Sequence, residues 1–196
     1  MNSPAPAVTR NTIKLLDVQN FTLPGKLAAV LFGTFFLTLS SYVEVPMFPV
    51  PMTMQTFAVM LVGALYGWRL GGVTIVAWLA EGAIGLPVLA GGAGGAQYFL
   101  GATGGYLFAF PIAGMTVGWL TERGWNGQRV WLSALAMAIG NAICLVLGAA
   151  WLAMLIGAVQ AIMLGVVPFI LGGLLKSALG AMTLKLLTRD TKPAAE

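Results

Sequence analysis

The chain of 196 residues contains no histidine and only one cysteine, Cys144. These absences exclude Ser/His and Cys/His nucleophilic machinery, imidazole metal sites, multi-cysteine zinc sites and disulfide frameworks. Charge is scarce as well, because 8% of the residues are charged against roughly 25% in an ordinary soluble domain. The six acidic residues are scattered along the chain and do not suggest a carboxylate cage for a metal ion. The sequence therefore predicts neither an enzyme nor a cofactor.

What the chain has in abundance is apolar surface. Hydrophobic residues make up 59% of it, and its mean hydropathy is +0.90. A soluble domain of this size leaves roughly 30% of its unfolded-chain area exposed to water, and ten basic plus six acidic residues are too few to keep that area hydrated. The net charge of +4 comes from isolated basic residues beside apolar segments, a pattern that sets membrane topology. We therefore expect membrane lipid around the protein, and no nucleic acid partner.

Apolar runs between charged residues and Gly/Pro punctuation predict six membrane-spanning helices, since one span needs about 20 apolar residues. The expected ranges are 27–42, 53–66, 72–86, 106–120, 131–156 and 169–187. The apolar stretch 157–167, divided from the last helix by Pro168, is expected to be an external segment packed against the bundle. The predicted fold is an all-α integral membrane protein with one six-helix domain over 26–188, between tails at 1–25 and 189–196.

The distribution of basic residues predicts the orientation of this domain. With a cytoplasmic N-terminus, nine basic residues fall on the inner side and none in the three outer connections, as the positive-inside rule requires. These nine are Arg10, Lys14, Lys26, Arg69, Arg123, Arg129, Lys185, Arg189 and Lys192. We therefore expect both termini in the cytoplasm and a multi-pass location in a bacterial plasma membrane.

Lys176 is the cation that this rule leaves over. It lies nine residues from Lys185, or about 14 Å along a helix, which places it near the bilayer midplane. A lysine there costs ~2.5–3.5 kcal/mol on insertion scales and is tolerated where a partner or a wet cavity receives it. An anionic ligand is the simplest partner. The alternatives are snorkelling to the interface and pairing with Glu81.

Uncharged polar residues in or near the spans form a second group of candidates. Gln55 and Asn141 carry amides that suit a ring with N–H and C=O groups, and interhelical hydrogen bonding is the alternative for both. Between residues 91 and 106, seven of sixteen residues are glycine and none is charged, which favours a close-packed loop that approaches a ligand. The candidates in this loop are Gly92, Gly94, Gln97, Tyr98, Thr103 and Tyr106.

A pair of small residues marks one face of the first predicted helix. Ala29 and Gly33 are four residues apart, so they lie on the same side of the helix. Such a surface permits close approach of another helix. It is either internal packing or a docking surface for another membrane protein.

Four motifs occur in a fixed order along the chain: VPMTMQT at 50–56, GAIGLPV at 82–88 running into GGAGG at 91–95, GATGGYL at 101–107, and PFILGGLLK at 168–176. They resemble the motifs of the BioY family, the biotin-binding S components of energy-coupling factor (ECF) vitamin transporters. The resemblance covers about residues 27–187. It implies a six-helix membrane protein that captures biotin from outside, between its outer loops and helices four to six.

The resemblance also implies partners. The family usually works with a transmembrane coupling protein and two ATPases, and some members are thought to act alone. The chain has no Gly-x-x-x-x-Gly-Lys-Ser/Thr phosphate loop. Any ATP hydrolysis is therefore expected to come from partner subunits.

Two positions depart from the family pattern. The last motif commonly has an aspartate three residues before the lysine, where this chain has Gly173, and some members carry asparagine at the position of Ala93. Under this resemblance, the biotin carboxylate meets Lys176, and the ureido ring meets side-chain amides and backbone groups of the glycine loop. Gln55, Gln97 or Asn141 would take over the missing polar contacts.

Two other functions compete with biotin capture. One is the binding of a different small vitamin in the same cavity. The other is a structural or assembly role, in which Lys176 pairs with a carboxylate of a neighbouring membrane protein.

Overall fold

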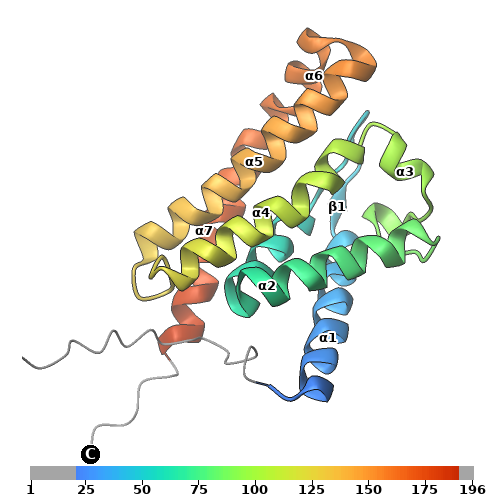
Figure 1. The fold of residues 1–196 in the computed structure, drawn as a ribbon. Coiled ribbons are helices and arrows are strands. Elements are labelled where there is room, and N and C mark those ends of the chain that lie inside the picture. Colours follow the sequence, from blue (N-terminus) through green and yellow to red (C-terminus); the bar gives the residue numbers. More distant parts are fainter. Residues whose placement is uncertain (1–20, 190–196) are drawn as a thin grey trace, which may run out of the picture.

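The computed structural model describes residues 21–189, and helices dominate this range (Figure 1). The long helices are α1 (Leu23–Ser41), α2 (Gln55–Ala83), α4 (Gly104–Glu122), α5 (Val130–Ile156) and α7 (Val167–Arg189). Shorter elements are the 3-10 turn η2 (Ala90–Gly92), α3 (Gln97–Leu100) and α6 (Ala158–Gly165). Two-residue strands β1 (Glu44–Val45) and β2 (Met52–Thr53) pair antiparallel, with Glu44 opposite Thr53.

Helix α2 reverses direction at Gly67. The backbone there has φ 77° and ψ 172°, a conformation that glycine adopts without a steric penalty. A Cβ placed on Gly71 would lie 3.0 Å from the Cα of Gly63, although residues eight apart in a straight helix are about 12 Å apart. The two halves, 55–66 and 68–83, are therefore antiparallel neighbours. They correspond to the second and third predicted spans.

The described chain thus contains six helical segments of membrane-spanning type, in the order expected from the sequence. By length and composition, Leu23–Ser41, Gln55–Ala83, Val130–Ile156 and Ala158–Thr188 are apolar enough to cross a membrane. The second of these contains the two halves of α2. Helix α4 completes the set and packs against both α2 and α5 (Figure 1).

Large apolar side chains cover the outside of the bundle. Leu31, Phe32 and Phe35 on α1 are exposed, as are Leu171 and Leu174 on α7. Contiguous apolar surface of this kind is unfavourable in water and favourable in lipid. The fold is that of an all-α, multi-pass integral membrane protein.

Small residues bring the central helices into backbone contact. Gly63 on α2 lies directly against the backbone of Gly114 on α4, as expected for bundles in which small residues let helices approach closely. Beside this contact, Trp78 is fully buried and stacks on Phe110 with ring centroids 6.0 Å apart. Its indole Nε1 donates to the carbonyl of Val88 at 3.1 Å, which ties the segment just before the glycine loop to α2.

The observed boundaries correct several expectations. Helix α1 begins at Leu23, inside the predicted tail at 1–25, because Pro24 occupies the first helical turn, where proline is favoured. Helix α7 begins at Val167, two residues before the predicted start, whereas the apolar segment expected at 157–167 is present as the short helix α6, packed against α5 and α7. The remaining tail residues, 1–20 and 190–196, lie outside the described range, and with them Arg10, Lys14 and Lys192.

Candidate functional site

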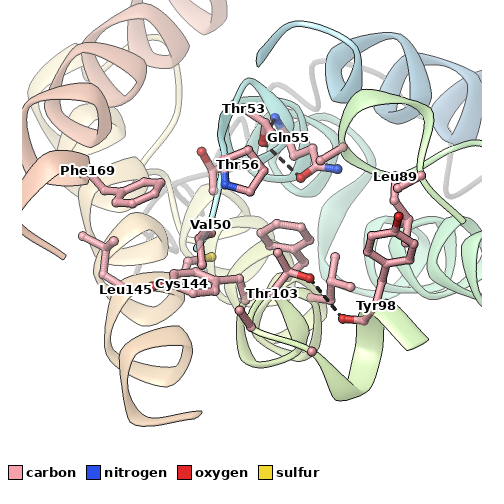
Figure 2. Close-up of a pocket in the computed structure, with 18 of the residues that line it drawn as sticks. Val50, Thr53, Gln55, Thr56, Leu89, Tyr98, Thr103, Cys144, Leu145 and Phe169 are labelled. Carbon is pink, nitrogen blue, oxygen red and sulfur yellow. Dashed lines mark hydrogen bonds between the residues drawn. The ribbon is translucent and has the colours of Figure 1, made fainter. Parts of the chain in front are cut away.

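A cavity of about 400 Å³ opens between the segments 49–53 and 89–103 and the helices α2, α4, α5 and α7 (Figure 2). Its volume falls in the range of small-molecule sites, about 300–1,000 Å³. The apolar part of its lining includes Val50, Leu89, Phe110, Leu145 and Phe169. A few polar side chains interrupt this surface, which is the usual composition of a site that binds a small molecule.

Lys176 is the one charged residue among the described residues that line the cavity. Its Nζ donates to the carbonyl oxygen of Thr53 at 2.6 Å and to Oγ1 of Thr56 at 3.2 Å. The side chain therefore turns from α7 across to the start of α2, and does not snorkel to a membrane interface. An ammonium group has three N–H bonds, so one donor remains for a ligand. Glu81, the other proposed partner, does not line the cavity.

Asn141 lines the cavity from α5 and ties this helix to α7. Its Nδ2 lies 3.1 Å from the carbonyl oxygen of Met137, 2.9 Å from Oγ of Ser177 and 3.4 Å from the carbonyl oxygen of Gly173. The interhelical hydrogen bond that the sequence offered as an alternative is therefore present. It coexists with a place in the cavity wall, because Asn141 and Gly173 both line the cavity.

Gln55 also lines the cavity, and its amide is bonded within the protein. Nε2 donates to Oγ of Ser41 at 3.1 Å, and Oε1 accepts a hydrogen bond from Oγ1 of Thr53 at 3.0 Å. These bonds connect the end of α1, strand β2 and the start of α2. Gln55 thus stabilises the loop beside the cavity, and it also lines the cavity.

The glycine loop contributes Gln97, Tyr98 and Thr103 to the lining. Oγ1 of Thr103 donates to the carbonyl oxygen of Tyr98 at 3.0 Å (Figure 2). Nε2 of Gln97 donates to the carbonyl oxygen of Gly94 at 3.0 Å. Both bonds stay within the loop, and they hold these side chains at the end of the cavity formed by the loop.

Tyr106 lines the cavity with its ring and not with its hydroxyl. The phenol donates to the carbonyl oxygen of Gly165, at the end of α6, at 2.7 Å. The ring stacks on Phe169, with centroids 6.3 Å apart and planes inclined by 29°. Tyr106 and Phe169 therefore form one aromatic wall for a flat or apolar part of a ligand.

Gly92 and Gly94 do not line the cavity, contrary to the expectation from the sequence. Gly92 has φ 79° and faces the phenol of Tyr42, and Gly94 packs against the carbonyl of Leu86. Both glycines therefore support the loop through contacts away from the cavity. The neighbouring loop residues that line the cavity are Ala90 and Ala93.

The pair of small residues on α1 is part of the internal packing of the chain. Gly33 is buried, and a Cβ there would lie 2.5 Å from Cγ2 of Thr74 and 3.1 Å from the ring of Tyr66. The Tyr66 hydroxyl donates to the carbonyl oxygen of Ala29 at 2.9 Å. Of the two interpretations of this pair, the docking surface is wrong for Gly33, because α2 covers it.

Several lining residues were missed by the sequence reasoning. Cys144 and Leu145 were not assigned to the site, although they lie three and four residues after Asn141 and so share its helix face. Thr56 follows Gln55 in the first turn of α2 and was missed as well. Helical periodicity counted from Asn141 would have found Cys144 and Leu145.

A bundle of membrane-spanning helices around a cavity of this size, with one cation and a few amides in an apolar wall, defines an integral membrane protein that binds a small molecule. The model of the BioY family matches residues 11–192. The chain belongs to the BioY family.

Individual relatives are similar over shorter regions. A probable biotin transporter BioY from Pyrococcus horikoshii is 41% identical over 81 residues, which cover 41% of this chain and 50% of that protein. The biotin transporter BioY from Thermotoga maritima is 35% identical over 90 residues, which cover 46% of this chain and 53% of that protein. The chain thus spans about half the length of these relatives.

A solved structure matches over a longer range. The crystal structure at 2.1 Å of the S-component for biotin from an ECF-type ABC transporter superposes with a TM-score of 0.75. The two chains are 28% identical, and the match covers 86% of this chain and 95% of that one.

Proposed function

We propose that this protein is the substrate-capture subunit of a biotin transporter of the ECF type. The observation that carries the proposal is the cavity, which lies between the outer loops and the helices of a fold similar to that of a biotin S-component. The family relatives that bear the name biotin transporter support the same substrate. The protein then acts by binding and release, and not as an enzyme.

The chemistry of the cavity suits biotin, which combines a cyclic urea, a thiophane ring and a carboxylate on an aliphatic chain. Lys176 offers one remaining donor, which would receive the carboxylate in a charge-assisted hydrogen bond. The aromatic wall of Tyr106 and Phe169 would pack against the apolar rings. Gln97 and Tyr98 stand at the outer end, where the ligand would enter from outside.

We propose further that transport uses partner subunits, a transmembrane coupling protein and two ATPases. The sequence contains no phosphate-binding loop of its own, so energy from ATP would have to come from such partners. The protein would reside in a bacterial plasma membrane, with both termini in the cytoplasm and the cavity facing outside.

Direct binding tests the substrate. The full chain, purified in detergent, should bind radiolabelled biotin saturably, and unlabelled biotin should displace the label while thiamine and riboflavin should not. Absence of saturable biotin binding, or equal displacement by the other vitamins, would remove the basis of the proposal. Uptake in a biotin-auxotrophic strain, with and without the coupling protein and ATPases, then tests the role of the partners.

A further inference from the structure

The hydrogen bonds around Asn141 determine which way its amide points. The carbonyl oxygens of Met137 and Gly173 can only accept hydrogen bonds. The hydroxyl of Ser177 donates its proton to the carbonyl oxygen of Gly173 at 2.7 Å, so its oxygen accepts from Asn141 at 2.9 Å. All three neighbours therefore require the amide nitrogen. Rotating the amide by 180° would place Oδ1 against three acceptors, so Nδ2 faces α7 and Oδ1 faces away from this network.

The Oδ1 atom of Asn141 has no donor within the described part of the chain. This oxygen is also accessible. Among the described residues, the fully buried side-chain polar atom that lacks a hydrogen-bond partner is Oγ of Ser133. Since Oδ1 of Asn141 lacks a partner and is not in that class, it is not fully buried. Asn141 as a whole is 8% exposed and belongs to the cavity wall. Its carbonyl oxygen is therefore an acceptor that is open to the cavity.

The part of the wall beside this oxygen carries no side chain. Gly173 on α7 has no side chain, and a Cβ placed there would lie 3.8 Å from Oδ1 of Asn141, at ordinary van der Waals distance. A ligand group can therefore approach Oδ1 along this side of the cavity. Lys176 lies one helical turn after Gly173 and lines the same wall of the cavity, where its ammonium group is a hydrogen-bond donor.

We infer that Oδ1 of Asn141 accepts a hydrogen bond from a ring N–H of the bound ligand and makes Asn141 a specificity-determining residue. This inference rests on the proposed function and adds an orientation to it. A carboxylate has only acceptors to offer and would be repelled by Oδ1, whereas a cyclic urea carries N–H donors. The urea end of the ligand therefore lies at Asn141, and the carboxylate lies toward Lys176.

The inference is tested by removing the donor and the acceptor separately. The ligands are biotin and the two biotin derivatives methylated at one or the other ureido nitrogen, and the proteins are the wild type and Asn141→Ala. We expect one N-methyl derivative to bind the wild type about tenfold more weakly than biotin, as for a lost hydrogen bond to a buried partner. Asn141→Ala should weaken biotin binding by a similar factor. It should change the affinity for that N-methyl derivative by less than about twofold, because the derivative already lacks the N–H that Asn141 would accept.

Two further variants separate recognition from bracing. Ser177→Ala removes one partner of Nδ2 and leaves Oδ1 in place, so it should change the melting temperature more than the biotin affinity. Gly173→Asp in the Asn141→Ala background returns an acceptor from the adjacent helix α7, where a side chain has room, and should recover part of the biotin affinity.

Three outcomes overturn the inference. One is an equal loss of affinity for biotin and for both methyl derivatives in Asn141→Ala, with no recovery by Gly173→Asp. That result would mean that Asn141 only stabilises the packing of α5 against α7. Another is wild-type protein that binds both methyl derivatives as tightly as biotin, a measurement that needs no variant and stands even if Asn141→Ala does not fold. The third is failure of the wild type to bind biotin, which removes the proposed function as well and is thereby distinguished from the first two.

Discussion

Replacing Lys176 with methionine tests the central electrostatic contact of the proposed site. Methionine keeps most of the volume of the lysine stem and removes the charge together with the donors to Thr53 and Thr56. Two neutral acceptors lose a partner, and a partly buried cation is removed from an apolar setting, so the two effects on stability oppose each other. The melting temperature in detergent should therefore change little.

The effect on binding should be much larger. A hydrogen bond to a charged group contributes about 1.5–3 kcal/mol, and 1.4 kcal/mol corresponds to one decade in affinity. Biotin should therefore bind Lys176→Met about 10- to 150-fold more weakly. The measurement is equilibrium binding of radiolabelled biotin to the purified protein.

Two controls make the result specific. Biotin amide lacks the carboxylate, so its affinity should barely differ between the wild type and Lys176→Met. Lys185→Met removes an exposed lysine from the same helix and should leave the affinity for both ligands unchanged. Equal losses of affinity for biotin and for its amide in Lys176→Met would refute the carboxylate assignment. They would mean that Lys176 holds α7 against α2 and does not bind the carboxylate.

Three other predictions concern topology and packing. A cysteine at Ala93, introduced into a Cys144→Ser background, should react with a membrane-impermeant maleimide in intact cells; reaction only after permeabilisation would reverse the proposed orientation. Gly33→Leu should destabilise the protein by about 1–3 kcal/mol, as for overpacking, because no space exists beside Gly33. The exposed Ala28, changed to leucine, is the matched control, and equal melting temperatures would contradict the internal packing. Tyr106→Phe should lower the free energy of unfolding by about 0.5–1.5 kcal/mol and change biotin affinity less than twofold, because its hydroxyl bonds the end of α6 and not the cavity; a tenfold loss of affinity would show that the phenol meets the ligand.

The order of the helices could be predicted because the chain marks each span with charge, glycine or proline. Gly67, Arg69 and Gly71 predicted a short turn between two spans, and the structure has the reversal at Gly67, within that turn. The start of α1 was misplaced because Lys26 was treated as a boundary, whereas Pro24 is compatible with the first turn of a helix.

The site was predictable where a residue type is unfavourable in its setting. Lys176 and Asn141 stand out because a charge or an amide within a membrane span needs a partner, and both line the cavity. The glycine loop was less readable. Gly92, Ala93 and Gly94 are consecutive, and Ala93 lines the cavity because Gly92 contacts Tyr42 and Gly94 contacts Leu86. Both of these contacts are with residues outside the loop.

The reversal in α2 determines where foreign sequence can be inserted into this protein. At Gly67 two helices are joined with no loop between them, and Gly63 and Gly71 lie almost in contact on either side. An epitope or a reporter inserted there would force these helices apart. Gly124, between α4 and α5, has φ 95° and nothing within 4 Å of where its Cβ would stand. Because the proposed topology places that turn in the cytoplasm, it is the place for a tag that tests this topology and leaves the bundle intact.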